Sequence, residues 1–147
     1  CIRDRFNKRS GMMGMTGFGD LREVHRLVAE GNEDAKLALD VYVHRIVGYI
    51  GNYTAQMGGV DVITFTAGVG ENDDVVRKMV CDKLAPFGVK LDEEKNATRS
   101  KEPRIISTPD SKITICVIPT NEELAIARKS AAIAEAGEDT YGNVFSK

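Results

Sequence analysis

The sequence predicts an α/β fold in which helices cover a parallel or mixed β-sheet. Residues 60–66 form a nearly continuous apolar, β-branched run, which is typical of a strand buried on both faces. Stretches with helical periodicity alternate along the chain with further strand-like runs, as expected for an α/β arrangement. The 147 residues correspond to about one domain, and no internal repeat is visible.

The first predicted helix follows a glycine-rich stretch. Residues 11–19, GMMGMTGFG, contain too many glycines for a helix, and we expect a loop or an irregular strand there. Asp20 has the character of an N-cap, and Glu23 follows three residues later, as in a capping box. The helix should run to about Glu30 and stop at Gly31.

A second, longer helix is predicted over residues 33–57, ended by Gly58-Gly59. Apolar residues recur along it at alternating steps of four and three and form one stripe: Leu39, Val43, Ile46, Ile50, Tyr53 and Met57. Four more lie outside that stripe: Val41, Tyr42, Val47 and Tyr49. Such a helix either packs on other helices of its own chain or forms a two-fold contact with a second copy.

Helix and strand signals continue after residue 72. Asn72 or Asp73 can cap a helix that runs to about Ala85, before Pro86. The next expected elements are a turn at 84–88, a short strand at 89–91, a polar surface segment at 92–102, strands at 105–106 and 113–118, and a turn at 108–111. Thr120 and Glu123 suggest a second capping box, and the following helix, through Ala134, should complete the core. Residues from 137 onward resemble a tail.

Composition argues against several functional classes. The 20 basic and 22 acidic residues give a net charge of −2, so nothing favours binding to nucleic acid. No apolar run approaches the ~20 residues that span a bilayer, and no signal peptide is expected. Three widely separated cysteines without a CxxC pair argue against a disulfide framework or a zinc site. We expect free thiols in a reducing cytoplasm, with Cys116 buried in a strand.

The stretch VITFTAGVGEN, residues 62–72, is the first candidate for chemistry. Glycines after a strand allow a ligand to approach the backbone, and a following helix start offers free N–H groups to the sugar or phosphates of a nucleotide. The stretch lacks the Gly-Lys-Ser/Thr of a P-loop and the GxGxxG pattern. A tight turn, with Asn72 as a simple N-cap, explains two glycines equally well.

Two further groups are candidates for phosphate or metal contacts. Glu122 follows the strand predicted at 113–118, and a carboxylate in that place can bind Mg²⁺ directly or through water. Asp20 and Arg22 begin the first predicted helix. Spacing alone favours the plainer interpretation for both groups, a helix cap and a solvated helix face.

Four motifs occur in an order that resembles the acetate kinase (acetokinase) family of the sugar kinase and actin ATPase superfamily: TAGVGEN, LDEEKN, STPDSK and VIPTNEELAIAR. NKRSGMMGMTGFGDLR and AEGNEDAKLALDVYVHRIVGYIG resemble the stretch just upstream. The resemblance covers residues 6–130 and only about the C-terminal third of such an enzyme. It implies a ribonuclease H-like, actin-like ATPase fold, with a mixed sheet flanked by helices. Residues 1–147 would be a single C-terminal nucleotide-binding and dimerisation domain, with the N-terminal domain absent.

The resemblance implies phosphoryl transfer from ATP to acetate, giving acetyl phosphate and ADP, in a cytoplasmic homodimer that uses Mg²⁺. In such an enzyme the loop on the adenosine side would consist of Gly68, Val69, Gly70, Glu71 and Asn72. The second nucleotide contact would be Asp20, Leu21 and Arg22, and Glu122 would be the carboxylate associated with magnesium. Two departures stand out. Ala67 replaces a family glycine and narrows the loop, and only Gly19 stands where two small residues usually precede the aspartate.

The family's acetate pocket and its catalytic arginines, aspartate and histidine would lie upstream, so we expect no catalytic residue in this chain and no activity from the chain alone. His25 and His44 do not match the family histidine, and we expect surface or packing roles for them. Two alternatives stay open. One is a propionate or butyrate kinase of the same family, and the other is a non-catalytic folding and dimerisation unit with a vestigial nucleotide loop.

Overall fold

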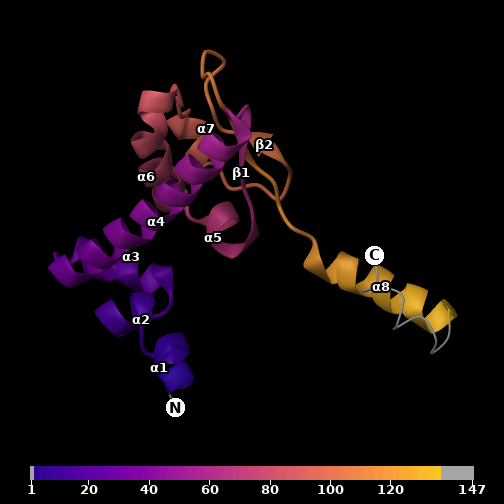
Figure 1. Ribbon diagram of the computed structural model, residues 1–147, viewed down its shortest axis with the longest axis horizontal. Coiled ribbons are helices and arrows are strands. Elements are labelled where there is room, and N and C mark those ends of the chain that lie inside the picture. Colours follow the sequence, from indigo (N-terminus) through magenta and orange to yellow (C-terminus); the bar gives the residue numbers. More distant parts are fainter. Residues whose placement is uncertain (1, 137–147) are drawn as a thin grey trace.

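The computed structural model describes residues 2–136 and confirms the α/β class (Figure 1). Four helices precede the first strand: α1 (Ile2–Lys8), α2 (Gly11–Thr16), α3 (Leu21–Ala29) and α4 (Glu33–Met57). The remaining elements are β1 (Val62–Phe65), α5 (Ala67–Asn72), α6 (Asp74–Leu84), the 3₁₀ turn η1 (Ala85–Phe87), α7 (Glu93–Ala97), β2 (Arg104–Ile105), β3 (Thr114–Val117) and α8 (Glu122–Ala136).

The sheet is mixed, with strand order β1-β3-β2. β1 runs parallel to β3, with Val62 opposite Thr114, and β2 runs antiparallel to β3, with Ile105 opposite Cys116. The parallel pair places the carboxyl ends of β1 and β3 at the same edge of the sheet, where α5 and the segment leading to α8 begin.

One face of the sheet is packed and the other is more open. In β3, Ile115 and Val117 are fully buried, whereas Cys116 is only half-buried. Val62 in β1 is exposed. The expectations of a strand buried on both faces and of a buried Cys116 are therefore wrong, because helices pack against a single face and alternate side chains turn away from it.

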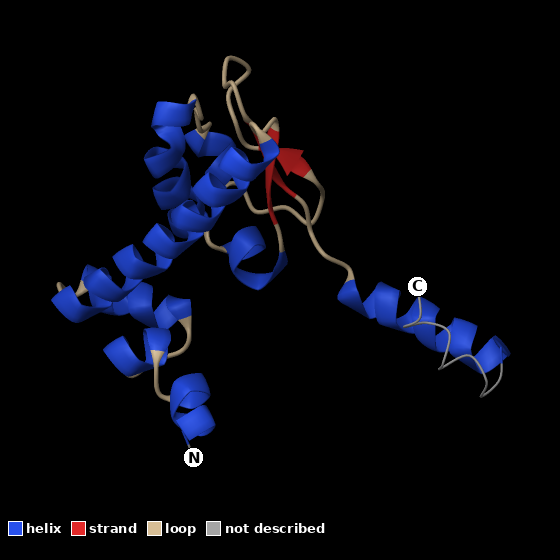
Figure 2. Cartoon of the chain, in the orientation of Figure 1, coloured by secondary structure: helices blue, strands red, loops and turns tan. Residues whose placement is uncertain are grey.

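The core joins that face of the sheet to α4 and α6, and α3 adds Val24 to it where α3 packs on α4. Figure 2 shows these helices gathered to one side of the strands. The buried side chains of the core are almost all aliphatic: Val24, Leu39, Val43, Val76, Val80, Leu84, Val89, Ile106, Ile113, Ile115 and Val117. Full burial of each such side chain stabilises the fold by about 1.5–3 kcal/mol. This core fixes α3 and α6, which carry part of the candidate site.

The long helix α4 has the predicted bounds. Asn32 caps it by accepting a hydrogen bond from the Ala35 amide at 2.9 Å, and Gly58 ends it in the left-handed conformation, with φ of 75°. The predicted stripe is buried only in its first part. Tyr53 and Met57 are 55% and 66% exposed, because the last turns of α4 extend beyond the core.

The glycine-rich stretch at 11–19 contains the helix α2, where a loop was expected. α2 packs against α4, and Met12 contacts the core. A Cβ atom added to Gly14 would lie 2.8 Å from the carbonyl oxygen of Arg9, so glycine permits a close approach there. Tertiary packing thus overrides a weak helix propensity.

The polar stretch at 92–102 is not merely surface. It forms α7, capped by Asp92 at the Lys95 amide, and it buries Asn96. The strand expected at 89–91 contributes only an isolated bridge between Leu91 and Ser107.

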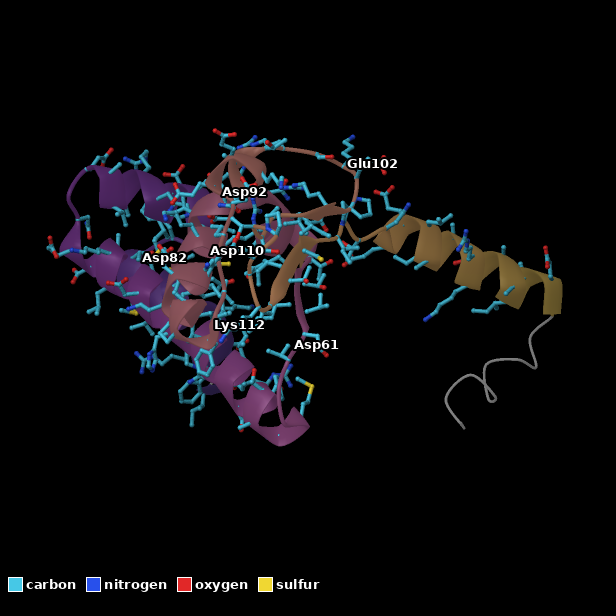
Figure 3. The ribbon with its side chains drawn as sticks, turned by 90° about the horizontal axis from the view of Figure 1, so that it is seen from above. Asp61, Asp82, Asp92, Glu102, Asp110 and Lys112 are labelled. Atoms are coloured by element: carbon cyan, nitrogen blue, oxygen red, sulfur yellow. The ribbon has the colours of Figure 1, made fainter. Side chains whose placement is uncertain are left out.

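The prediction of a second capping box, from Thr120 and Glu123, is wrong. The side-chain oxygen of Asn121 caps α8 by accepting from the Leu124 amide at 3.0 Å. Nor does α8 complete the core, since its residues are almost all exposed and it extends away from the sheet (Figure 3). In the first capping box Asp20 does cap α3, but Glu23 binds Arg26 and does not return to Asp20. The predicted tail from 137 lies outside the described residues.

None of the helices within residues 2–136 combines the length and apolar character that crossing a bilayer requires.

Candidate functional site

The candidate site is a cleft of about 1070 Å³, slightly above the ~300–1,000 Å³ range of small-molecule sites. The start of α3 and α5 line it, with contributions from α2, α4, the start of α6 and the loop after α7. Its lining residues are Met12, Gly19, Asp20, Leu21, Arg22, His25, Tyr42, Gly68, Val69, Asn72, Asp73, Asp74, Val75 and Arg99. Two segments that the sequence separates by more than forty residues thus meet in one cleft.

The glycine segment is a short helix, α5, and not a loop. It follows β1 through Thr66, and Ala67 has φ of 59°, in the left-handed region. That conformation costs an alanine about 1–2 kcal/mol, which glycine avoids. The replacement of the expected glycine by Ala67 therefore strains the entry to α5.

Gly68, Val69 and Asn72 face the cleft, as the nucleotide hypothesis expects of a contact segment. A Cβ atom added to Gly68 would meet no atom within 4 Å, so the backbone there is accessible. The Asn72 side chain donates to the Gly68 carbonyl at 2.8 Å, and Asp73 caps α6 by accepting from the Val76 amide at 2.9 Å. Of the two residues expected to cap α6, Asn72 and Asp73, it is therefore Asp73 that does so.

Gly70 and Glu71 do not line the cleft. Gly70 packs on β1, because a Cβ atom added to it would lie 3.1 Å from the carbonyl carbon of Phe65. Glu71 accepts hydrogen bonds from the amide and the hydroxyl of Thr120, at 2.8 and 3.0 Å. The hydrogen bond from the Thr120 amide is the main reason that the pKa of Glu71 is lowered. These two predicted contacts therefore hold α5 in place.

Asp20 and Arg22 form an ion pair at the cleft. Arg22 Nη2 lies 2.6 Å from Asp20 Oδ2, and Arg22 Nε lies 3.1 Å from both carboxylate oxygens. The side-chain hydrogen bond from Arg22 lowers the pKa of Asp20 to about 2, so Asp20 is ionised at neutral pH. Arg22 and Arg99 bring two guanidinium groups to the cleft, and guanidinium groups suit phosphate oxygens.

His25 lies in the wall of the cleft, where the sequence led us to expect a surface or packing role. Its Nε2 atom is 2.7 Å from Oδ2 of Asp73, and both side chains are largely buried. Tyr42 lies in the same wall, and its pKa is raised by burial and then by the charge of Asp73. The sequence did not reveal this group, because its members come from α3, α4 and the start of α6. His44 is exposed on α4.

The predicted metal ligand is not in the cleft. Glu122 is exposed at the first residue of α8 and does not line the cavity. Within residues 2–136, no three histidine, cysteine, aspartate or glutamate side chains gather in a way that would hold a metal ion. The described residues therefore do not fit a metal site by themselves.

Residues 1–128 match the acetokinase family. The chain is 54% identical over 129 residues to the acetate kinase of Carboxydothermus hydrogenoformans and 55% identical over 135 residues to that of Desulfotalea psychrophila. These matches cover 88% and 92% of the chain but 32% and 33% of the relatives, so the chain spans about one third of their length.

Solved structures agree in fold. The acetate kinase of Porphyromonas gingivalis matches with a TM-score of 0.80 at 42% identity, over 90% of this chain and 34% of that one. A propionate kinase from Francisella tularensis matches with a TM-score of 0.78 at 39% identity, over 87% of this chain and 32% of that one. The likeness confirms the actin-like ATPase fold. The chain belongs to the acetokinase family.

Proposed function

We propose that residues 1–147 are the C-terminal nucleotide-binding and dimerisation part of an acetate kinase. The whole enzyme would transfer the γ-phosphoryl group of ATP to acetate and release acetyl phosphate and ADP in the cytoplasm. One observation carries this proposal. The two segments that the family resemblance names as nucleotide contacts, at residues 20–22 and 68–72, line the same cleft through six of their members.

The cleft residues have properties that suit a nucleotide. The exposed backbone at Gly68 permits close approach of a ligand, and Val69 adds an apolar surface. Arg22 and Arg99 offer cations to phosphate oxygens, and charge-assisted hydrogen bonds of this kind are about twice as strong as neutral ones. Phosphoryl transfer depends mostly on such positioning and charge stabilisation. The acid pocket and the catalytic side chains would lie in the two thirds of the relatives that this chain does not match.

Magnesium enters the proposal only as the ion that accompanies ATP. Mg²⁺ commonly uses one or two carboxylates together with substrate phosphates and water. Glu122 is the carboxylate that the resemblance assigns to this ion, but Glu122 does not line the cleft.

A two-fold contact through α4 is part of the same proposal. Tyr49, Tyr53 and Met57 leave a large apolar and aromatic surface exposed on this helix, and the two tyrosine rings stack with centroids 6.3 Å apart. Added Cβ atoms at Gly48 and Gly51 would meet nothing within 4 Å, which leaves room for a second helix to approach. Burial of this surface against a second copy would remove it from water.

A chimera tests the proposed activity. The matching third of the Carboxydothermus hydrogenoformans enzyme would be replaced by this chain, since 54% identity favours a compatible interface. We expect the chimera to form acetyl phosphate from ATP and acetate at roughly 1–100 per second. A folded chimera without this activity would contradict the proposal.

The same chimera tests the alternative that the chain belongs to a propionate kinase, like the Francisella tularensis protein of similar structure. If the acid pocket lies outside this chain, the chimera keeps the acetate-to-propionate preference of its host. A reversed preference would show that residues of this chain select the acid.

A further inference from the structure

Arg77 on α6 is a buried cation without a carboxylate partner among the described residues. The residue is 2% exposed, and none of the ion pairs within residues 2–136 includes it. A buried charge is costly unless its donors are satisfied. The contacts that satisfy Arg77 therefore matter to the fold around it.

All acceptors of Arg77 are neutral, and they belong to two other helices. Nη1 donates to the carbonyls of Gly70 and Glu71 at 2.9 Å each, and both carbonyls lie in the last turn of α5. Nε donates to Oδ1 of Asn96 at 2.8 Å, and Nη2 donates to the Asn96 carbonyl at 2.7 Å. One planar group thus joins α5, α6 and α7.

Asn96 completes the arrangement. It is 4% exposed, and its Nδ2 atom donates to the Asp74 carbonyl at 2.9 Å, at the start of α6. Asn96 therefore accepts from Arg77 through its side chain and its backbone while it anchors α7 to α6. The guanidinium fork is held in one orientation, pointing at the end of α5.

The last carbonyls of a helix have no partner within the helix, and short helices are unstable on their own. α5 has six residues, and Arg77 binds two of its terminal carbonyls. The other contacts of α5, from Glu71 to Thr120 and from Asn72 to Gly68, leave these carbonyls free.

We propose that Arg77 and Asn96 are positioning residues for the nucleotide cleft: they fix the end of α5 so that Gly68, Val69 and Asn72 face the ligand. This inference rests on the proposed function. Arg77 touches no part of the cleft itself, because it is absent from the lining residues.

The test compares ATP affinity, by isothermal titration, with stability, by urea unfolding, in the full chain. Arg77→Met should weaken ATP binding about tenfold or more, since it removes hydrogen bonds from a charged donor. Arg77→Lys keeps the charge but not the fork, and should weaken binding by a smaller factor. Asn96→Ala should act in the same direction, because it frees the guanidinium.

Two control variants separate positioning from general stability. Lys78→Met breaks the exposed contact with Glu93 at 2.7 Å, which also joins α6 to α7 but does not reach α5. Val80→Ala creates a cavity in the core on the same helix. Both controls should keep the ATP affinity of the parent within about twofold. The proposal would be overturned if Arg77→Met loses no more ATP affinity than Val80→Ala. If Arg77→Met does not fold, the loss of ATP affinity in Arg77→Lys is compared with that in Val80→Ala in the same way.

Amide hydrogen exchange gives a second readout that needs no ligand. In Arg77→Lys, the amides of Asp73 and Thr120, which are bonded to Val69 and Glu71 of α5, should exchange about tenfold faster, while the Val43 amide in α4 should be unchanged. Unchanged exchange at Asp73 and Thr120 would overturn the positioning role. A parent chain that does not bind ATP would contradict the proposed function, and this exchange result would still decide whether Arg77 holds α5.

Discussion

Gly70 lies directly against the backbone of Phe65: a Cβ atom added to Gly70 would be 3.1 Å from the carbonyl carbon of Phe65 and 3.4 Å from its Cα. At Gly68, two residues earlier in α5, an added Cβ atom would meet nothing within 4 Å, and Gly68 faces the cleft. The two glycines of one motif therefore serve different purposes, one in packing and one in access.

This difference predicts opposite results for the same substitution. Gly68→Val should reduce ATP affinity about tenfold or more while the free energy of unfolding stays within ~1 kcal/mol, because the branched side chain occupies the cleft. Gly70→Val should destabilise the chain by about 1–3 kcal/mol through overpacking against β1. Titration calorimetry and urea unfolding measure the two effects. If Gly68→Val binds ATP with the affinity of the parent chain, α5 is not part of the nucleotide site.

Ala67→Gly should stabilise the chain by up to about 1 kcal/mol. The left-handed φ of 59° is strained for alanine and free for glycine, although glycine loses more entropy on folding. Ala55→Gly in the right-handed helix α4 is the matched control and should destabilise by about 0.5–1 kcal/mol. If urea unfolding shows that both variants change the free energy of unfolding in the same direction, Ala67 is not strained.

The Asp20–Arg22 ion pair should persist to low pH during acid titration. The folded pKa of Asp20, about 2, lies below the ordinary value of 3.8, so the stabilising effect of this pair is present above that value and is lost as the pH falls toward 2. NMR titration of the side-chain carboxyl should show a midpoint near 2 in the parent and a higher midpoint in Arg22→Ala.

Asp110 provides an internal control in the same titration. Lys90 also lowers its pKa to about 2, and that pair is independent of Arg22. Its midpoint should not move in Arg22→Ala. An Asp20 midpoint that also stays in place would show that Arg22 is not the cause of the shift.

Tyr49→Glu should convert the proposed dimer into a folded monomer. Tyr49 is 52% exposed and stacks with Tyr53, and a carboxylate in a dry contact between helices costs several kcal/mol. Analytical ultracentrifugation would compare this variant with Ala55→Glu, at another exposed position of α4. A parent chain that sediments as a monomer at high concentration would exclude a stable contact through this surface.

Elements with strong local signals could be predicted from the sequence. The bounds of α4 follow from a helical repeat and from Gly58-Gly59, which stops the helix in the left-handed conformation. The mixed α/β character followed from the order of the elements. The register of β1 with β3 could not be predicted, because it joins Val62 to Thr114, 52 residues later.

Short helices were missed where distant contacts stabilise them. Composition alone marks α2 and α5 as loops, yet α2 packs on α4, and Arg77 binds the end of α5. The opposite error occurred at α8, which was expected to complete the core although it is exposed in the described chain.

The candidate site was predicted in part. Asp20 and Arg22 are near neighbours, so their pairing is accessible from the sequence, and the family motifs marked residues 68–72. The partners of Glu71 and His25, Thr120 and Asp73, lie 49 and 48 residues away. No local pattern shows such pairs, which is why Glu71 was expected at the ligand and Asp73 was considered only as a cap.

The central claim is that ATP binds in the cleft between the start of α3 and α5. Backbone amide NMR of the chain during titration with ATP and Mg²⁺ tests it most directly. We predict saturable shifts that cluster at residues 19–25 and 67–75, with none along α8, and loss of this pattern in Gly68→Val. The absence of saturable shifts, or a cluster of shifts away from these two segments, would contradict the claim.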